Sequence, residues 1–266
     1  GGYIIAGGSP SNDGDVTGNH GESDFWIVKL NSSGDIEWQK SLGGSSNDYA
    51  WSIKQTSDNS YVIAGNSSSN DGDVSTNYGD TDYWIVKLTA SGDIEWEKAF
   101  GGSGVDEARS ITLTADGGYI IAGFSNSNDG DVTGNHGDTD YWIVKLSSEG
   151  EIEWQKSLGG SRPEQANSIK QTIDGGYVIA GFSDSNDGDV TSNHGDTTDY
   201  WIVKLSNEGE IDWQKSFGGY DFDQALSIQQ TTDGGYIIGG ESKSSDGDVP
   251  ENRGDYDAWI IKLDEN

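Results

Sequence analysis

The 266-residue chain contains no cysteine and few basic residues. Without cysteine, no disulfide, thiolate metal site or cysteine nucleophile can form. Its 15 Lys and Arg stand against 46 Asp and Glu, which gives a formal net charge of −31 at pH 7. Nucleic acid and anionic membranes both bind basic surfaces, so this charge argues against either as a partner. A surface this acidic suits divalent cations instead.

Long apolar runs are also missing. No stretch approaches the roughly 20 apolar residues of a membrane-spanning helix, and no secretory signal peptide is recognisable. The sequence opens on "GGYIIAG", in the middle of a repeat, as a fragment of a longer precursor would. We therefore expect no membrane insertion, and we expect flanking domains in a longer protein.

Glycine and large aromatic residues are abundant, and most of them belong to an internal repeat. The 40 glycines follow no G-X-Y period, so they indicate many turns and not collagen. The string Tyr-[Ile/Val]-Ile-[Ala/Gly]-Gly and the string Trp-Ile-[Val/Ile]-Lys-Leu each recur every 58 or 59 residues. They begin at Tyr3, Tyr61, Tyr119, Tyr177 and Tyr236, and at Trp26, Trp84, Trp142, Trp201 and Trp259. The units run approximately over residues 1–49, 50–107, 108–165, 166–224 and 225–266.

Each unit predicts four short strands and no helix. In the second unit the strands are 51–56, 60–65, 82–88 and 94–100. The third strand is apolar at both even and odd positions, so it should be covered on both faces. The fourth places Ile94, Trp96 and Phe100 opposite Glu95 and Glu97, as in a half-buried outer strand. Four-stranded units that pack around an axis are typical of a β-propeller.

The strand count bears on closure of the ring. The second and third strands occur five times and the first and fourth only four times, which gives 18 strands where five complete blades need 20. We predict an all-β fold: a single β-propeller domain over residues 1–266, with five blades of four antiparallel strands. Its closing strands are either lost or supplied by flanking sequence. A slice of a larger ring is the alternative.

The repeat resembles a known family. The strings "LGGSSNDYAWSIKQTSDNSYVIAGNSSSNDGD" and "GDTDYWIVKLTASGD" resemble the SBBP-type β-propeller repeats of large secreted or surface-anchored bacterial proteins. They are also similar to repeats of Bacteroidetes surface proteins that carry a C-terminal sorting domain. The resemblance implies a propeller fold and an extracellular or cell-surface location, but no shared catalytic activity. Family members often place Phe-Pro where this chain has an Asp-Gly-Asp-Val loop, so that loop must be interpreted from its own chemistry.

An acidic loop joins the second and third strands of every unit. Its pattern is D-G-D-V-x-x-N-x-G-[D/E], with a further Asp just before the third strand. The residues are Asp13, Asp15, Asn19, Glu22 and Asp24; Asp71, Asp73, Asn77, Asp80 and Asp82; Asp129, Asp131, Asn135, Asp138 and Asp140; Asp187, Asp189, Asn193, Asp196 and Asp199; and Asp246, Asp248, Asn252, Asp255 and Asp257. Hard cations such as Ca²⁺ bind roughly 6–8 oxygens in flexible loops of this composition. We predict that these residues bind Ca²⁺.

The alternative is that the loops are ordinary turns. Asp-Gly and Asn-x-Gly form turns in which carboxylates cap backbone amides. However, a turn needs one such residue and not five. Zinc or copper is not expected, because His20, His136 and His194 share one repeat position that Tyr78 and Arg253 fill in the other units.

Residues that break the repeat are candidates for ligand binding. Trp51 is the one tryptophan outside the third and fourth strands, and its counterparts are Arg109, Asn167 and Leu226. Aromatic and guanidinium groups are enriched in recognition hot spots. We predict one binding surface at one end of the propeller, made of Tyr49, Trp51, Arg109, Arg162, Tyr220 and Phe222. The alternative is that Trp51 is buried against a neighbouring blade.

These patterns favour a binding module over an enzyme. Catalysis needs an asymmetric constellation of acid, base and positioning groups, whereas the acidic residues here mostly recur five times. We expect an extracellular, calcium-stabilised binding or adhesion module of a larger bacterial surface protein, with a carbohydrate or protein partner. A purely structural spacer is the second hypothesis, and a glycoside-active enzyme is the third.

Overall fold

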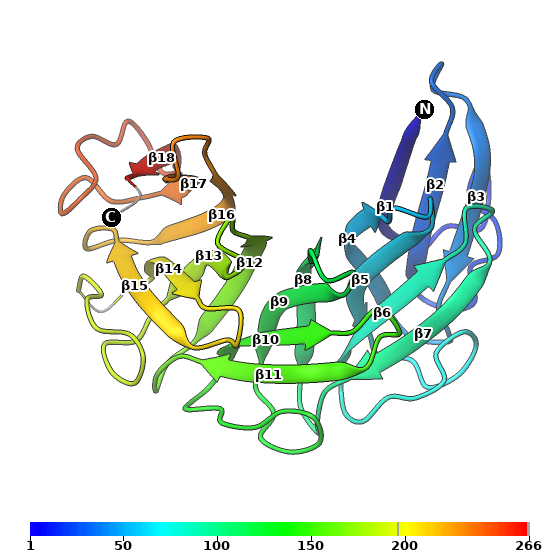
Figure 1. Cartoon of the computed structure of the whole chain (residues 1–266), viewed down its shortest axis with the longest axis horizontal. Helices are drawn as coiled ribbons and strands as arrows, with labels where there is room; N and C mark the ends of the chain where they lie inside the picture. The colour runs from blue at the N-terminus through cyan, green and yellow to red at the C-terminus, as the bar shows by residue number, and fades with distance from the viewer. Residues whose placement is uncertain (196, 265–266) are drawn as a thin grey trace. The chain divides into compact units, whose positions relative to one another are not determined.

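The fold consists of antiparallel β-strands. The computed structural model describes residues 1–195 and 197–264, and these residues form 18 strands and no α-helix. The strands make three four-stranded sheets and two three-stranded sheets (Figure 1). The prediction of an all-β fold with 18 strands is confirmed. Within the described part of the chain, no helix could cross a membrane.

Every sheet is a simple meander, because strands that are neighbours in sequence are hydrogen-bonded neighbours in space. The first strand of a unit is β4 (Asp48–Gln55), β8 (Asp106–Leu113), β12 (Glu164–Gln171) or β16 (Asp223–Gln230). The second is β1 (Tyr3–Ser9), β5 (Tyr61–Ser67), β9 (Tyr119–Ser125), β13 (Tyr177–Ser183) or β17 (Tyr236–Ser242). The third is β2 (Asp24–Leu30), β6 (Asp82–Leu88), β10 (Asp140–Leu146), β14 (Asp199–Leu205) or β18 (Asp257–Leu263). The fourth is β3 (Ile36–Leu42), β7 (Ile94–Phe100), β11 (Ile152–Leu158) or β15 (Ile211–Phe217).

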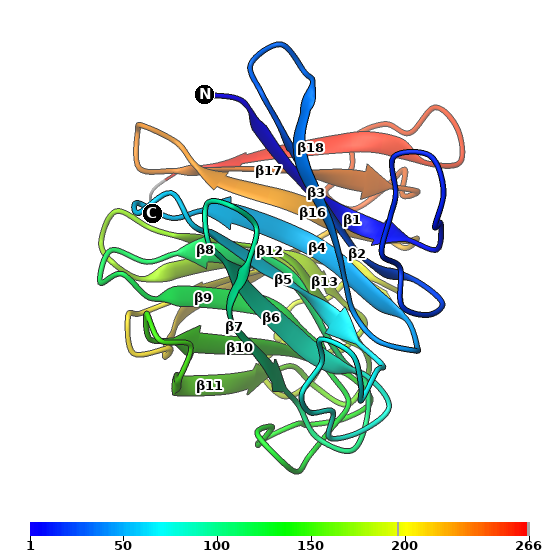
Figure 2. The same cartoon turned by 90° about the vertical axis from the view of Figure 1, so that its right-hand side faces the viewer.

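The chain forms two compact units, unit 1 and unit 2, each of which is larger than a single repeat. Unit 1 contains Gly1–Ile111 and Ser127–Asp131, and unit 2 contains Thr112–Asn126 and Val132–Asn266. The sheets β1–β3 and β4–β7 belong to unit 1, and the sheets β12–β15 and β16–β18 belong to unit 2. Figure 2 shows β16, β17 and β18 side by side. The single domain over residues 1–266 stays a prediction.

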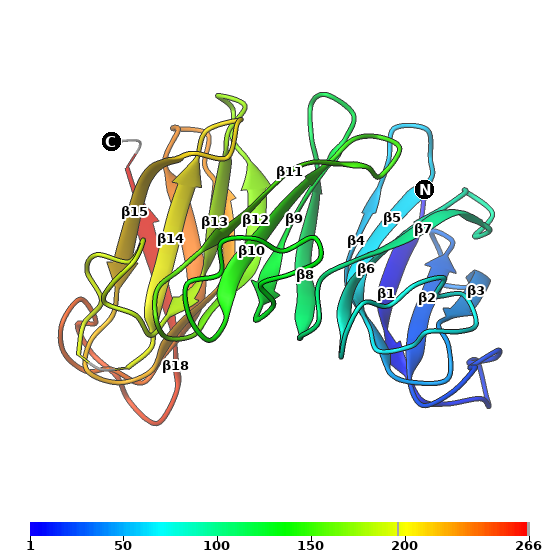
Figure 3. The same ribbon diagram turned by 90° about the horizontal axis from the view of Figure 1, so that it is seen from below.

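The meander separates two kinds of connection. In an antiparallel sheet, the turns after the first and third strands lie at one end. The long acidic loop after the second strand and the link to the next sheet lie at the other end, as β12–β15 illustrate (Figure 3). The acidic loop of one unit can therefore meet the link between sheets, whereas the short turns form a separate surface.

The third strands form the core, as the sequence predicts. Every residue of β6, β10 and β14 is buried, and Trp84, Trp142 and Trp201 are fully covered. In β18, which is the edge strand of a three-stranded sheet, burial alternates, and Ile260 is 67% exposed. The fourth strands are half-buried as expected, except that Ile36, Ile94 and Ile211 are exposed at the starts of β3, β7 and β15.

Candidate functional site

The first two aspartates of an acidic loop hold the glycine pair that links one sheet to the next. Asp71 Oδ1 accepts a 2.7 Å hydrogen bond from the backbone N–H of Ser45. Asp73 Oδ2 accepts from the N–H of Gly43 at 3.2 Å, and the Asp73 N–H donates to the Gly43 carbonyl at 2.9 Å. The same contacts recur at Asp129 and Asp131, at Asp187 and Asp189, and at Asp246 and Asp248. These aspartates cap backbone N–H groups, whatever else they bind.

The asparagine of the loop closes the loop on itself. Asn77 Nδ2 donates to the Ser67 carbonyl at 3.1 Å, and its Oδ1 accepts from the Gly79 N–H at 2.9 Å. Asn19, Asn135, Asn193 and Asn252 bond in the same way to the serine that ends the preceding strand. The exposed loop residues are Asp13, Asp15, Glu22, Asp71, Asp80, Asp129, Asp138, Asp187, Asp246, Asp248 and Asp255. Asp196 lies outside the described residues.

The last aspartate of the loop is buried at the start of the third strand. Asp24, Asp82, Asp140 and Asp199 are 0% exposed, whereas Asp257 is half-buried. In the four buried residues, Oδ2 accepts a backbone N–H from His20, Tyr78, His136 or His194. The buried Oδ1 atoms of these four have no hydrogen-bond partner among the described residues. Within the part of the chain that the structure describes, the same buried oxygen is therefore left without a protein partner in four repeats.

A second buried carboxyl group, which the loop pattern does not include, lies beside each of these aspartates. Asp106, the first residue of β8, donates its N–H to the Thr81 carbonyl at 2.7 Å and is 0% exposed. A methyl group on Gly101 would lie within 2.6 Å of oxygens of both Asp82 and Asp106, so only glycine fits between them. The same arrangement joins Asp24 with Asp48, Asp140 with Glu164, and Asp199 with Asp223. The sequence does contain a signal for this second carboxyl group, because an acidic residue stands five positions after the first glycine of each link.

Burial and like charge raise the pKa values of Asp82 and Glu164. Burial, with the nearby charges of Asp106 and Asp131, raises the pKa of Asp82 to about 7. Burial, with the charge of Asp140, raises the pKa of Glu164 to about 7. Desolvation disfavours the charged form, and a second carboxylate disfavours it further. Asp82 and Glu164 therefore retain protons near neutral pH unless a cation compensates them.

The predicted calcium ligands are thus regrouped in the structure. Among the described residues, the oxygen side chains of one loop do not converge on one point. Instead, the last aspartate of one loop lies near the second aspartate of the next loop and near the newly identified acid, as in Asp82, Asp131 and Asp106. Among the residues described, no group of three or more His, Asp or Glu side chains is arranged to hold a metal ion. Calcium binding stays a prediction.

In unit 1, three of the predicted ligand-binding residues come together. The Arg109 guanidinium lies 4.2 Å from the centroid of the Trp51 ring, and the rings of Tyr49 and Trp51 are 6.4 Å apart. The indole N–H of Trp51 donates to Asn66 Oδ1 at 2.7 Å. Trp51 is 48% exposed and Tyr49 is 38% exposed, so the group is an ordered aromatic surface rather than core.

In unit 2, the other three predicted residues lie in different surroundings. Tyr220 is 71% exposed. Phe222 packs against Phe182 and Tyr256, with ring centroids 6.5 Å and 5.9 Å away. Arg162 lines a cavity of about 200 Å³. That all six residues form a single surface stays a prediction.

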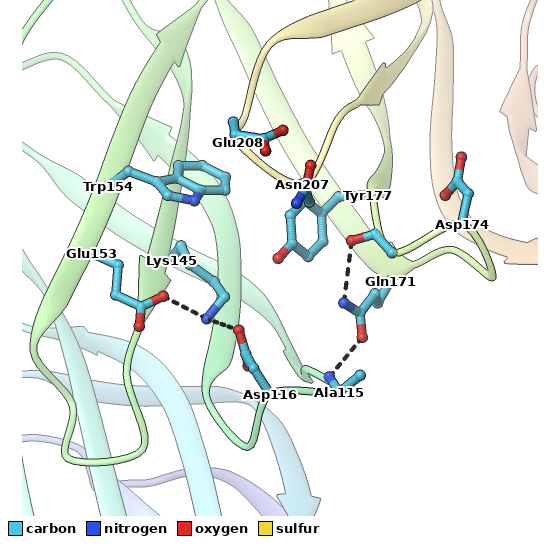
Figure 4. A pocket seen from close by; sticks show the side chains of 11 residues that line it. Ala115, Asp116, Lys145, Glu153, Trp154, Gln171, Asp174, Tyr177, Asn207 and Glu208 are labelled. Atoms are coloured by element: carbon cyan, nitrogen blue, oxygen red, sulfur yellow. Dashed lines mark hydrogen bonds and ion pairs between the residues drawn. The ribbon is translucent and has the colours of Figure 1, made fainter.

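A larger cavity, which sequence reasoning missed, lies in unit 2 among the short turns (Figure 4). We call it the Trp154 cavity, and its volume is about 430 Å³. Trp154 and Tyr177 face it from β11 and β13, and their ring centroids are 5.8 Å apart. The remaining lining residues are Ala115, Asp116, Lys145, Glu153, Gln171, Asp174, Gly175, Asn207 and Glu208. They span almost 100 positions of sequence, so no local motif reveals them.

Comparison with known proteins gives distant similarities. No protein-family model matches the chain. The regulatory protein FlaEY of Caulobacter vibrioides is 27% identical over 172 residues, which cover 59% of this chain and 18% of that protein. The match therefore spans less than a fifth of the length of FlaEY.

Several solved structures are similar at low sequence identity. A protein of unknown function from Dyadobacter fermentans is 12% identical, with a TM-score of 0.49, over 93% of this chain and 71% of that chain. A protein of unknown function from Bacteroides caccae is 13% identical, with a TM-score of 0.43, over 99% and 90%. The WD40 domain of Neurospora crassa Pan2 is 10% identical, with a TM-score of 0.40, over 84% and 70%.

Proposed function

We propose that this chain is part of a five-bladed β-propeller that serves as an extracellular binding module of a larger bacterial surface protein. Five repeats, each built on one antiparallel meander, support the propeller. The resemblance to SBBP-type repeats supports the location. The expected partner is a carbohydrate or a protein.

The observation that carries the binding function is the Trp51 surface of Tyr49, Trp51 and Arg109. Trp51 stands where the other units have Arg109, Asn167 or Leu226, so the repeat itself does not require an aromatic residue there. Its ring is held on one side by Arg109 and by the hydrogen bond to Asn66, yet 48% of the residue is exposed. A pre-ordered, half-exposed tryptophan is typical of a binding hot spot.

Calcium is proposed as a stabilising ion at the acidic loops. The donor groups are carboxylates and amides, which suit a hard cation. The unsatisfied Oδ1 atoms of Asp24, Asp82, Asp140 and Asp199 support a cation near the links between sheets. A buried carboxylate without compensation is costly, so an ion there would stabilise the fold.

A structural spacer is the alternative, and catalysis is not proposed. The buried acid pairs recur four times and lie around the glycines that join the sheets, which is what a structural role requires. An enzyme needs one asymmetric set of groups at one substrate.

A glycan array, probed with and without calcium, tests the binding function. Trp51→Ala should abolish the signal of at least one glycan, while Leu226→Ala should retain every signal. Leu226 is a matched control, because it occupies the same repeat position in β16 and is also 48% exposed. If Trp51→Ala retained the signal of every glycan that the parent chain binds, the Trp51 surface would not be a glycan-binding site. The absence of any ligand would favour the spacer.

A further inference from the structure

We propose that the Trp154 cavity of unit 2 is a second ligand site, separate from the Trp51 surface, and that it binds a neutral saccharide. Its volume of about 430 Å³ lies in the range of small-molecule sites. An aromatic wall and a ring of polar groups face the same space (Figure 4).

The charges at the base of the cavity are already paired. Lys145 Nζ lies 2.8 Å from Glu153 and 3.0 Å from Asp116, and the Lys145 side chain is only 3% exposed. Asp174 lies 3.0 Å from Lys204. The acidic partners are about half exposed or more, but Lys145 and Lys204 are buried. An ionic ligand that displaced one member of these pairs would leave a buried lysine with less compensation, and an uncompensated buried charge is costly. The base of the cavity therefore favours a neutral ligand.

Four other side chains keep their hydrogen-bonding groups available. The Trp154 indole N–H, the Tyr177 hydroxyl, the Asn207 amide and the Glu208 carboxylate line the cavity and have no hydrogen-bond partner within the described residues. Trp142 of β10 differs, because its indole N–H is bonded to Gln155 at 2.9 Å. The free groups comprise one pure donor, one pure acceptor and two groups that do both.

This combination matches the chemistry of a pyranose ring. A saccharide presents a hydrocarbon face that can pack on an indole ring, and hydroxyl groups that both donate and accept. The Trp154 ring supplies the apolar wall, and Tyr177, Asn207 and Glu208 supply partners for hydroxyl groups around it. A purely apolar ligand would leave these polar groups unsatisfied, and that loss lowers affinity.

The rim of the cavity differs from the rim of its counterpart in unit 1. In unit 1, the ring centroids of Trp38 and Tyr61 are 5.9 Å apart, close to the 5.8 Å between Trp154 and Tyr177 in unit 2. However, the turn that corresponds to Asn207 and Glu208 carries Ala90 and Ser91. The groove lined by Tyr61 measures only about 200 Å³. The amide and the carboxylate at the rim therefore distinguish the Trp154 cavity from its counterpart.

Isothermal titration calorimetry tests this proposal on the whole chain. The probes are neutral hexasaccharides of glucose, xylose, mannose and N-acetylglucosamine, with hexalysine as the charged comparison. We expect saturable binding of at least one saccharide. Tyr177→Phe and Asn207→Ala should each raise Kd about tenfold, because each removes about one hydrogen bond in the site. Tyr61→Phe is the matched control and should leave Kd unchanged.

The outcomes separate this site from the Trp51 surface. Loss of affinity in Tyr177→Phe, with Trp51→Ala unchanged, supports the cavity whether or not the Trp51 surface binds anything. Loss in Trp51→Ala alone supports the Trp51 surface and overturns the cavity. Binding of hexalysine alone, or no saturable binding of any saccharide, also overturns it. Unchanged melting temperatures in the variants establish that each change in affinity is local.

Discussion

The guanidinium carbon of Arg109 lies 4.2 Å from the centroid of the Trp51 ring. Both partners are fixed by further contacts: Trp51 donates to Asn66 at 2.7 Å, and Arg109 pairs with Glu107 at 2.6 Å. A side chain that is already held in one orientation loses little conformational freedom when a ligand binds. The stacking therefore prepares Trp51 for recognition and does not bury it.

Replacing Trp51 should cost little stability. Trp51→Ala removes one cation–π contact and one hydrogen bond from a half-exposed residue, so we expect a loss of about 1–2 kcal/mol. Trp84→Ala, at a residue that is 0% exposed, should cost the roughly 3–5 kcal/mol typical of a core tryptophan. Urea unfolding of both variants provides the comparison. Equal losses would mean that Trp51 is a packing residue.

Alanine at a linking glycine should destabilise unit 2. In Gly159→Ala the added methyl group would lie 2.9 Å from Asp140 Oδ1 and closer still to Glu164. Overpacking of this kind costs about 1–3 kcal/mol. Gly239→Ala is the control, because no atom lies within 4 Å of its added methyl group. Similar unfolding midpoints for the two variants would show that the carboxyl pair moves aside freely.

Strand positions could be predicted from the sequence because their signals are local. The third strand reads Asp-Tyr-Trp-Ile-Val-Lys-Leu in three repeats, and its apolar residues at both even and odd positions require cover on both faces. The repeat then gave the count of 18 strands without any knowledge of packing.

The grouping of acidic residues could not be predicted in the same way. Within one loop, Asp129 and Asp131 precede Asp140 by about ten residues, which suggested one shared ion. In the structure, Asp131 faces the glycine link of the preceding sheet, next to Asp82 and Asp106. Which loop meets which link depends on how sheets pack, and sequence spacing within a loop contains no such information.

Stability in the presence of a chelator should fall as pH rises from about 4.5 to about 7. The pKa of Glu164 is 4.5 ordinarily and about 7 in the folded protein, where burial and Asp140 raise it. The folded state then binds more protons than the unfolded state within this window, so proton loss destabilises the fold. The contribution of Glu164 is on the order of 3 kcal/mol. Thermal unfolding at a series of pH values measures it.

Glu164→Gln is the matching variant for this pH dependence. Glutamine keeps the shape of the side chain but does not titrate, so the decline between pH 4.5 and 7 should become shallower. The effect of Asp116 on stability depends on pH in the opposite direction, because the pKa of Asp116 is lowered to about 2. Its stabilising contribution is lost only as pH falls below about 4. An unchanged slope in Glu164→Gln would contradict the assignment of a raised pKa to this residue.

Calcium should raise the melting temperature at pH 7 relative to excess chelator. A ligand that binds only the native state stabilises it by mass action. The difference should shrink at pH 5, because protons and the cation compete for the same carboxylate oxygens. Identical melting curves with calcium and with chelator at pH 7 would mean that the loops bind no calcium and act only as turns that cap backbone amides.

A double substitution in one loop separates ion binding from capping. Asparagine at positions 129 and 131 can still accept the N–H groups of Ser103 and Gly101 that Asp129 and Asp131 accept now, but it carries no charge. If the aspartates only cap, Asp129→Asn with Asp131→Asn should melt like the parent chain under both conditions. If they bind calcium, the variant should lose part of the calcium-dependent gain and keep the part due to the other loops. Asp93→Asn, in an exposed turn at the other end of its sheet, controls for the loss of negative charge alone and should retain the full gain.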